Sequence, residues 1–337
     1  LVSHELFHAW NGKRLRPAEL GPFDYESEVP TRTLWFVEGV TSYYDDLVLR
    51  RAGLAGDEQY LGRLGETAER VETAPGKDLQ SLADASYDAW IKFYRRDENS
   101  ANHTISYYAK GALVAWLLDA RLRRATGDAK SLDDLLRAAW QRFGRSSGYR
   151  AADLYALAAE LGGDEVGDWL RQAVERPGGL DYAPALDAFG LRFVEKPRRP
   201  AEGEEANGGD AAPGDDGTAG DDACARRAWL GARTEVRDGR LIVTEVRRGT
   251  PAFDAGLNVD DELIAVDGFR VPPRGLAARL AAHRPEQPVE LLVARRERLL
   301  PLPAVLAAEP PCPWKLEVDP EATDEQRRRR ERWLGGG

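Results

Sequence analysis

Apolar residues recur at the three-to-four spacing of amphipathic helices throughout residues 1–195. The longest such stretch is ISYYAKGALVAWLLDARLRRAT, and the shorter stretches DLYALAAEL and VGDWLRQAVE follow later. A further stretch, LDDLLRAAWQRF, is preceded by a capping-box pattern from Ser131 to Asp134 and followed by Gly144, a typical C-terminal stop. The pattern predicts a mainly α-helical domain over residues 1–195.

The pattern changes beyond this region. Residues 196–226 are rich in Gly, Ala, Pro and acidic side chains and hold almost no residue able to build a core, which predicts a flexible linker. The short apolar runs WLGA, LIVTEV, ELIAV and VELLVA follow, separated by Gly, Pro, Asn and Asp, and predict a small β-rich domain over residues 227–308. Residues 309–337 form a C-terminal tail. Its segment DEQRRRRERWLGGG could make one or two amphipathic turns, although a solvated basic helix end is the favoured interpretation.

Composition adds little to this division. The chain has 337 residues and is 42% hydrophobic, which is ordinary globular content for two or three domains. No apolar run reaches the roughly eighteen residues that a membrane-spanning helix needs, and the first residues show no signal peptide. The sequence contains no Met and opens directly in a helical motif, so we expect a soluble fragment that lacks its N-terminal region. Periplasm or secretion is the favoured location, although the compartment does not follow from these residues.

The charge of the chain is concentrated in the linker. The formal net charge is −10, and residues 201–222 contain eight carboxylates and no Lys or Arg. The acidity therefore argues neither for nor against a charged substrate, and we expect no nucleic-acid partner. Cys224 and Cys312 flank the β-rich domain and could either pair or remain free thiols.

The candidate chemistry begins at the first residues of the chain. His4-Glu5-Leu6-Phe7-His8 is an HExxH motif with helical character, so both imidazoles lie one turn apart on one face and can hold one zinc ion. Glu5 is placed to take a proton from water. A catalytic zinc site needs a third protein ligand, and Glu38 follows His8 after 29 residues, within an apolar helical segment. Because an unpaired carboxylate among apolar residues is costly, we interpret Glu38 as the third ligand rather than a solvated side chain.

These two motifs resemble a known family. WFVEGVTSYYDDL is similar to the third-ligand helix of the gluzincin (thermolysin-like) metallopeptidases, and HELFHAWNGKRLRPAEL with its 29-residue interval resembles the glycyl aminopeptidase (M61) family. The resemblance extends over SLADASYDAWIKFYRRDEN and the C-terminal DEQRRRRERWL. It implies cleavage of N-terminal residues from peptides, with a preference for glycine and alanine.

The resemblance also suggests a residue that stabilises the oxyanion. The segment from Tyr107 to Gly111 resembles the Y-x-K-G element of related zinc aminopeptidases, which gives this role to Tyr108 rather than to Tyr107. A packed aromatic in the helical core is the competing interpretation. His103 could contact substrate but is interpreted as a surface histidine, and His283 as a structural or exposed one.

The side chains that orient the two imidazoles are left open among three residues. A metal-binding histidine usually donates its other ring nitrogen to a partner that fixes the ring. The candidates lie one to two turns beyond Glu38: Thr41, Ser42 and Asp45.

The β-rich domain resembles a PDZ domain of bacterial type. The resemblance is carried by TPAFDAGLNVDDELIAVDG, with RGLAARLAAH as the helix that lines the peptide groove. It places the carboxylate-binding loop at Trp229, Leu230, Gly231 and Ala232, where backbone N–H groups could receive the C-terminus of a peptide ligand. Packing against the catalytic domain is the alternative role for such a domain.

The sequence thus predicts a zinc aminopeptidase that acts on peptides. A zinc endopeptidase remains open, because no carboxylate that would bind a substrate amine is identifiable. A catalytically silent helical domain joined to a PDZ module is the alternative from another class, and the intact Glu5 argues against it.

Overall fold

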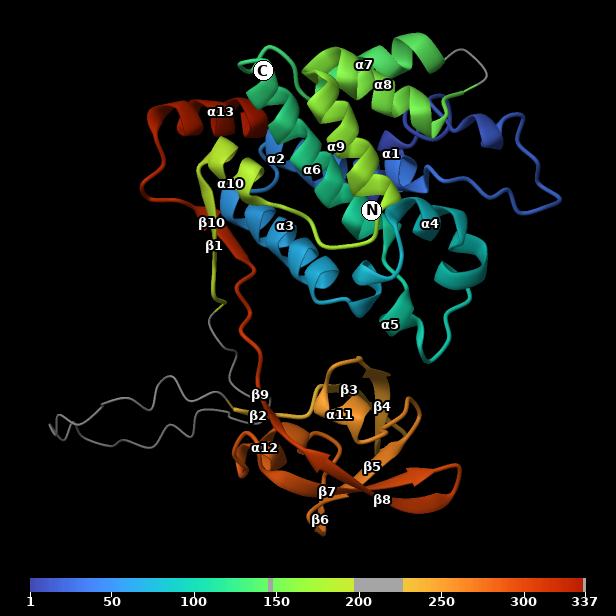
Figure 1. Cartoon of the computed structure of the whole chain (residues 1–337), viewed down its shortest axis with the longest axis vertical. Helices are drawn as coiled ribbons and strands as arrows, with labels where there is room; N and C mark the ends of the chain where they lie inside the picture. The colour runs from blue at the N-terminus through green and yellow to red at the C-terminus, as the bar shows by residue number, and fades with distance from the viewer. Residues whose placement is uncertain (145–147, 197–226, 336–337) are drawn as a thin grey trace, which may run out of the picture. The chain divides into compact units, whose positions relative to one another are not determined.

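The computed structural model describes residues 1–144, 148–196 and 227–335, which divide into two compact units (Figure 1). Unit 1 comprises Leu1–Lys196 with Cys312–Gly337, and unit 2 comprises Pro197–Pro311. The expected linker, apart from its first residue, lies outside the described residues, and so does Cys224. Pairing of Cys224 with Cys312 therefore stays untested. No helix in the described part of the chain is long and apolar enough to cross a membrane.

Unit 1 is built around the helix α6 (Tyr107–Ala125), which is buried on nearly all sides. An α-helix that is apolar around its whole circumference must be covered by neighbours on every face. Figure 1 shows α6 passing between the surrounding helices of unit 1. These neighbours are α2 (Val40–Arg51), α3 (Asp57–Glu72), α4 (Leu82–Tyr87), α7 (Leu132–Phe143), α8 (Ala151–Gly162), α9 (Asp164–Glu175) and α10 (Ala183–Phe189).

Shorter elements complete the helical part. They are α1 (Val2–Phe7), α5 (Ser100–His103), the single π-helical turns η2 (Trp35–Gly39) and η4 (Ala89–Phe93), and the 3₁₀ turns η1 (Ala18–Leu20) and η3 (Pro75–Asp78). The expected capping box is present, with Ser131 and Asp134 bonding reciprocally at the start of α7, and Gly144 ends that helix. The prediction of a mainly helical region is confirmed.

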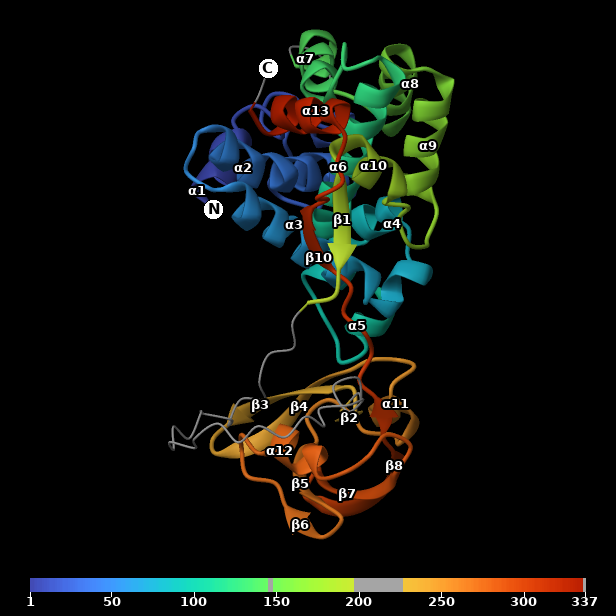
Figure 2. The same ribbon diagram turned by 90° about the vertical axis from the view of Figure 1, so that its left-hand side faces the viewer.

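The C-terminal residues belong to unit 1. Strand β1 (Leu191–Val194) pairs antiparallel with β10 (Lys315–Val318), and the two lie side by side in Figures 1 and 2. The helix α13 (Asp324–Gly335) then packs on α10 and α2. Unit 2 is therefore an insertion between two paired strands of unit 1, because the chain leaves unit 1 after β1 and returns to it at β10.

This return differs from the solvated helix end expected at the tail. Trp333 and Leu334 are buried, and the Trp333 indole Nε1 donates to the Tyr43 hydroxyl at 2.6 Å. Arg329 is also buried and pairs with Asp128 at 2.9 Å. The polar composition of the segment concealed this packing, because Arg329 and Arg330 bond to other segments of unit 1 rather than only to water.

Unit 2 is a β-rich domain with its own core. Its main sheet has the order β3-β4-β5-β7-β8, with β6 beside β5, and β2 pairs separately with β9. The predicted apolar runs coincide with these strands, and two short helices accompany them. The strands are β2 (Ala228–Trp229), β3 (Ala232–Arg237), β4 (Arg240–Val246), β5 (Glu262–Val266), β6 (Phe269–Arg270), β7 (Pro288–Arg295), β8 (Arg298–Val305) and β9 (Ala307–Ala308), and the helices are α11 (Pro251–Asp254) and α12 (Leu276–Ala281).

Candidate metal centre and peptide groove

The two histidines of the HExxH motif lie on one side of α1. His4 is in the helix and His8 caps its C-terminus with helical backbone angles. Their ring centroids are 4.6 Å apart and the rings are nearly perpendicular, at 87°. The four-residue spacing therefore gives both imidazoles access to one point, and Glu5, between them in sequence, is exposed.

Glu38 completes a group of three. Its Oε2 atom lies 3.3 Å from His4 Nε2 and 3.2 Å from His8 Nε2. Three ligand atoms at about 2.1 Å from one tetrahedral centre are separated by about 3.4 Å, so both measured separations fit a shared metal ion. Among the residues described by the structure, this is the one cluster of His, Cys, Asp and Glu side chains with such geometry.

Each imidazole is oriented through its other nitrogen. His4 Nδ1 lies 2.9 Å from Asp45 Oδ2, and His8 Nδ1 lies 2.9 Å from the backbone oxygen of Asn11. Both partners are acceptors only, so each Nδ1 carries the proton and each Nε2 presents its lone pair to the Glu38 carboxylate. At this distance an imidazole lone pair and a carboxylate oxygen repel each other, unless a proton or a metal cation lies between them. The donor set therefore fits a divalent metal.

The electrostatics of the group also favour a cation. A proton on Nε2 of His8 would be donated to the Glu38 carboxylate, and this hydrogen bond raises the pKa of His8 despite partial burial of the ring. Burial alone would raise the pKa of Glu38, but its interactions with His8 and His4 outweigh this and lower the pKa. A carboxylate kept ionised beside two imidazoles is suited to hold positive charge.

Of the three residues predicted to orient the imidazoles, only Asp45 forms a hydrogen bond with a histidine. Burial raises the pKa of Asp45, and the hydrogen bond from His4 opposes this effect. The Thr41 hydroxyl instead donates to the Val37 backbone oxygen at 2.5 Å, one turn earlier in η2. In the described part of the chain, the two Nδ1 atoms bond to Asp45 and to the Asn11 backbone oxygen, and Ser42 is the partner of neither.

Asn11 is a residue that the sequence analysis missed. It is 1% exposed, and its amide donates to the backbone oxygens of Phe36 and Val37 at 2.8 and 3.1 Å. It therefore joins the loop after α1 to the turn that carries Glu38, while its own carbonyl holds His8. A polar residue three positions after the second histidine was the available signal.

A pair of glycines sets how closely the Glu38 turn approaches α6. A Cβ atom on Gly39 would lie 2.5 Å from the Gly111 Cα, and one on Gly111 would lie 2.7 Å from the Trp35 backbone oxygen. Only glycine permits this approach of the two backbones. It places the start of α6, where Tyr108 lies, beside the turn that carries Glu38.

The two candidate tyrosines differ in their surroundings. The Tyr108 ring stacks near His4, with centroids 6.2 Å apart and an angle of 27°, and it is only partly buried. Tyr107 is 1% exposed, and its hydroxyl is 3.5 Å from that of Tyr94. Burial and then the charge of Glu38 raise the pKa of Tyr108, which keeps its hydroxyl protonated as a donor. The structure thus brings Tyr108, rather than Tyr107, to the histidines.

The other predicted histidines lie elsewhere. His103 ends the short helix α5, and its Nε2 is 3.5 Å from Asp97 Oδ1. His283 belongs to unit 2, where it bonds to Asp267 and to the Arg279 backbone oxygen at 3.0 Å each. Its predicted structural role agrees with these contacts.

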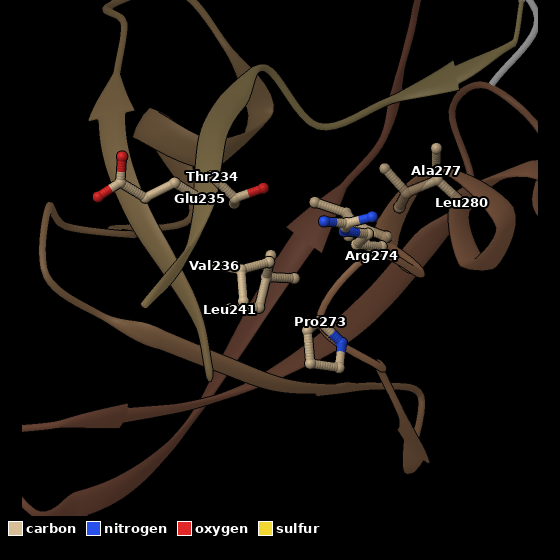
Figure 3. A pocket seen from close by; sticks show the side chains of 9 residues that line it. Thr234, Glu235, Val236, Leu241, Pro273, Arg274, Ala277 and Leu280 are labelled. Carbon is tan, nitrogen blue, oxygen red and sulfur yellow. The ribbon is translucent and has the colours of Figure 1, made fainter. Parts of the chain in front are cut away.

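The predicted carboxylate loop of unit 2 lies between β2 and β3. Trp229 ends β2, Leu230 is buried and Ala232 begins β3. Gly231 has a φ of +79°, and a Cβ there would lie 2.5 Å from the Thr250 side chain, so the turn requires glycine. A cavity of about 390 Å³ lies farther along β3, between this strand and α12 (Figure 3).

Two families match separate parts of the chain. Residues 1–114 match the M61 glycyl aminopeptidase family, and residues 228–303 match the PDZ domain family. One segment of the chain is therefore similar to the M61 glycyl aminopeptidase family and another to the PDZ domain family. This confirms both resemblances inferred from the sequence.

Solved structures give a further comparison. An aminopeptidase N family protein from Idiomarina loihiensis is similar over 98% of this chain and 53% of its own length, with 31% identity and a TM-score of 0.82. The chain therefore spans about half the length of that protein. The HtrA-type protease AlgW with a decapeptide and a serine endoprotease from Yersinia pestis each match over 26% of this chain and 30% and 32% of their own, at 24% and 21% identity and TM-scores of 0.24 and 0.23. No curated protein matches the chain. The M61 family and the Idiomarina neighbour support peptidase activity.

Proposed function

We propose that this chain carries the catalytic centre of a zinc-dependent aminopeptidase of the gluzincin type. The observation that carries the proposal is the convergence of His4, His8 and Glu38, with both imidazoles oriented through Nδ1. Two nitrogens and one carboxylate oxygen form the ligand set of many catalytic zinc sites, and such a site keeps a fourth position open for water or substrate.

The residues around the group have distinct roles in peptide hydrolysis. A zinc ion held by His4, His8 and Glu38 would supply Lewis acidity, which lowers the pKa of water to near neutral. Glu5 accepts the proton of the attacking water and returns it to the leaving amine. Tyr108 donates its hydroxyl proton in a hydrogen bond to the carbonyl oxygen as negative charge develops on it. Asp45 and the Asn11 carbonyl keep both imidazoles in one tautomer.

The expectation that the enzyme removes N-terminal residues rests on the family and on the Idiomarina neighbour. We infer glycine and alanine as the preferred N-terminal residues. Peptides with a free N-terminal glycine and the same peptides with an acetylated N-terminus distinguish an aminopeptidase from an endopeptidase. An aminopeptidase cleaves the free peptide and leaves the acetylated one intact.

The decisive experiment replaces Glu5 by Gln in the complete natural protein. An amide has the same shape but cannot accept the proton, so the variant keeps one zinc per chain and loses at least about 10²-fold in kcat. Metal analysis and a glycyl reporter substrate measure the two quantities. Glu66, an exposed carboxylate on α3, provides the matched Glu66→Gln control. Unchanged turnover in Glu5→Gln contradicts the proposed mechanism.

The cavity of unit 2 favours a second function beside the first. A groove between β3 and α12, next to a glycine turn, is the arrangement in which a peptide joins the sheet as an extra strand. We infer that unit 2 binds a peptide C-terminus, with the carboxylate at Trp229–Ala232. The outcome of the peptide-binding experiment below tests this second function directly.

A further inference from the structure

The groove of unit 2 has an apolar floor beside an open strand edge. Leu241 and Leu280, 5% and 8% exposed, form the floor. Strand β3 is the last strand of the main sheet, so one edge of its backbone faces no other strand of that sheet. Val236, on this strand, is 46% exposed. An open edge beside an apolar groove accommodates an extended peptide, because the backbone pairs with the strand while alternate side chains enter the groove.

The groove carries one positive charge without a partner. Figure 3 shows the Arg274 guanidinium in the space between Val236 on one side and Ala277 on the other. Among the described residues, Arg274 is exposed and forms no ion pair or side-chain hydrogen bond. The single acidic residue of the lining, Glu235, points away from this space in the figure, and its carboxylate pairs with Arg237. An apolar groove with a free guanidinium complements an apolar peptide that carries one carboxylate.

We propose that unit 2 selects peptide C-termini with an acidic side chain at the third or fifth residue from the end, and that Arg274 is the selecting residue. This inference rests on the proposed peptide-binding function of unit 2. With the terminal carboxylate held where β3 begins, the strand advances about 3.3 Å per residue. The lining residues Thr234 to Val236 are two to four residues beyond Ala232. Because strand side chains alternate, the third and fifth residues share the face of the last one, and the fourth points away.

The experiment measures binding of short synthetic peptides to the whole chain by fluorescence anisotropy. Each peptide ends in Leu and carries a fluorophore on its N-terminus, which blocks removal of N-terminal residues. One peptide has Glu at the third position from the end, one at the fifth and one at the fourth, and a reference peptide has Gln at all three. We expect the third- or fifth-position acid to bind about three- to fivefold more tightly than the reference at low salt, as for an accessible ion pair. The fourth-position acid matches the reference, and 0.5 M salt removes the preference.

Two variants make the assignment specific. Arg274→Gln binds the Gln reference as the original chain does and loses the preference for acid, whereas Arg274→Glu prefers a peptide with Lys at the same position. Arg298, an exposed residue outside the groove lining, provides the control Arg298→Gln, which keeps the preference.

The outcomes separate this inference from the functions on which it rests. Equal binding of acidic and Gln peptides overturns the selection by Arg274 and leaves peptide binding in place. Retention of the acid preference in Arg274→Gln overturns it as well. If no peptide binds at all, both the peptide-binding function and its selectivity fall. An amidated C-terminus that binds as tightly as the free one refutes the placement of the carboxylate at Trp229–Ala232. None of these results affects hydrolysis, which the Glu5 variant tests independently.

Discussion

Asp45 offers the sharpest test of the proposed metal centre. His8 is oriented by a backbone carbonyl, which no side-chain substitution removes, whereas His4 is oriented by the Asp45 carboxylate at 2.9 Å. Asn at position 45 keeps an oxygen that can accept the hydrogen bond but loses the negative charge. Ala removes both. The pair of variants therefore separates the effect of charge from the effect of ring orientation.

The expected magnitudes follow from what each variant removes. Loss of a partner that orients a metal-binding histidine costs about 10- to 100-fold in metal affinity. We expect Asp45→Asn to lose about 10-fold in zinc affinity and Asp45→Ala about 100-fold. These losses correspond to about 1.4 and 2.7 kcal/mol of binding free energy. Competition for zinc with a chromophoric chelator measures the affinity on this chain alone, without any assay of activity.

A neighbouring carboxylate provides the control. Asp46 forms an ion pair with Arg63, and among the described residues it forms no ion pair with His4 or His8. Asp46→Asn therefore keeps the original zinc affinity, and circular dichroism checks that all three variants remain folded. Zinc affinity unchanged in Asp45→Ala, or lowered equally in Asp46→Asn, would refute the argument that Asp45 holds His4 for the metal.

The remaining predictions concern α6 and α13. Tyr108→Phe lowers kcat on a glycyl reporter by on the order of 10²-fold, as for loss of one oxyanion donor, while Tyr107→Phe stays near the original rate. The reverse order in a steady-state assay contradicts the assignment. Trp333→Ala removes a side chain that is 0% exposed and costs about 3–5 kcal/mol of the free energy of unfolding, or roughly 6–20 °C in Tm. The half-exposed Trp90 gives the control Trp90→Ala, and equal melting temperatures of both variants in calorimetry contradict the packing of α13.

Much of the helical region and of the candidate site could be predicted because the signals are local. Two histidines four residues apart share a face of any helix, and the capping pair at Ser131 and Asp134 is set within one turn. Likewise, short apolar runs separated by Gly, Pro, Asn and Asp predicted the strands of unit 2. Such patterns depend only on neighbours along the chain, so the local structure can be predicted without knowing the tertiary structure.

Contacts between distant segments could not be predicted in this way. Thr41, Ser42 and Asp45 were equivalent candidates, and only the angle between α1 and α2 brings Asp45 to His4. In the sequence, Asn11 stands out only as a polar residue three positions after His8. Its role depends on its backbone carbonyl and on amide hydrogen bonds to the distant turn that carries Glu38, and no local pattern predicts those partners.

The return of the chain to unit 1 after unit 2 shows most clearly which features the sequence determined and which only the tertiary structure decided. The sequence by itself determined the HExxH motif, the helical region and the resemblance to a PDZ domain, because each is encoded by local spacing or by a family motif. Only the tertiary structure decided that residues 315–335 complete unit 1, with β10 beside β1 and Trp333 bonded to Tyr43. The physical reason is that an arginine-rich helix is polar on its own, and its burial becomes favourable only where a folded partner offers carboxylates, carbonyls and an apolar pocket together.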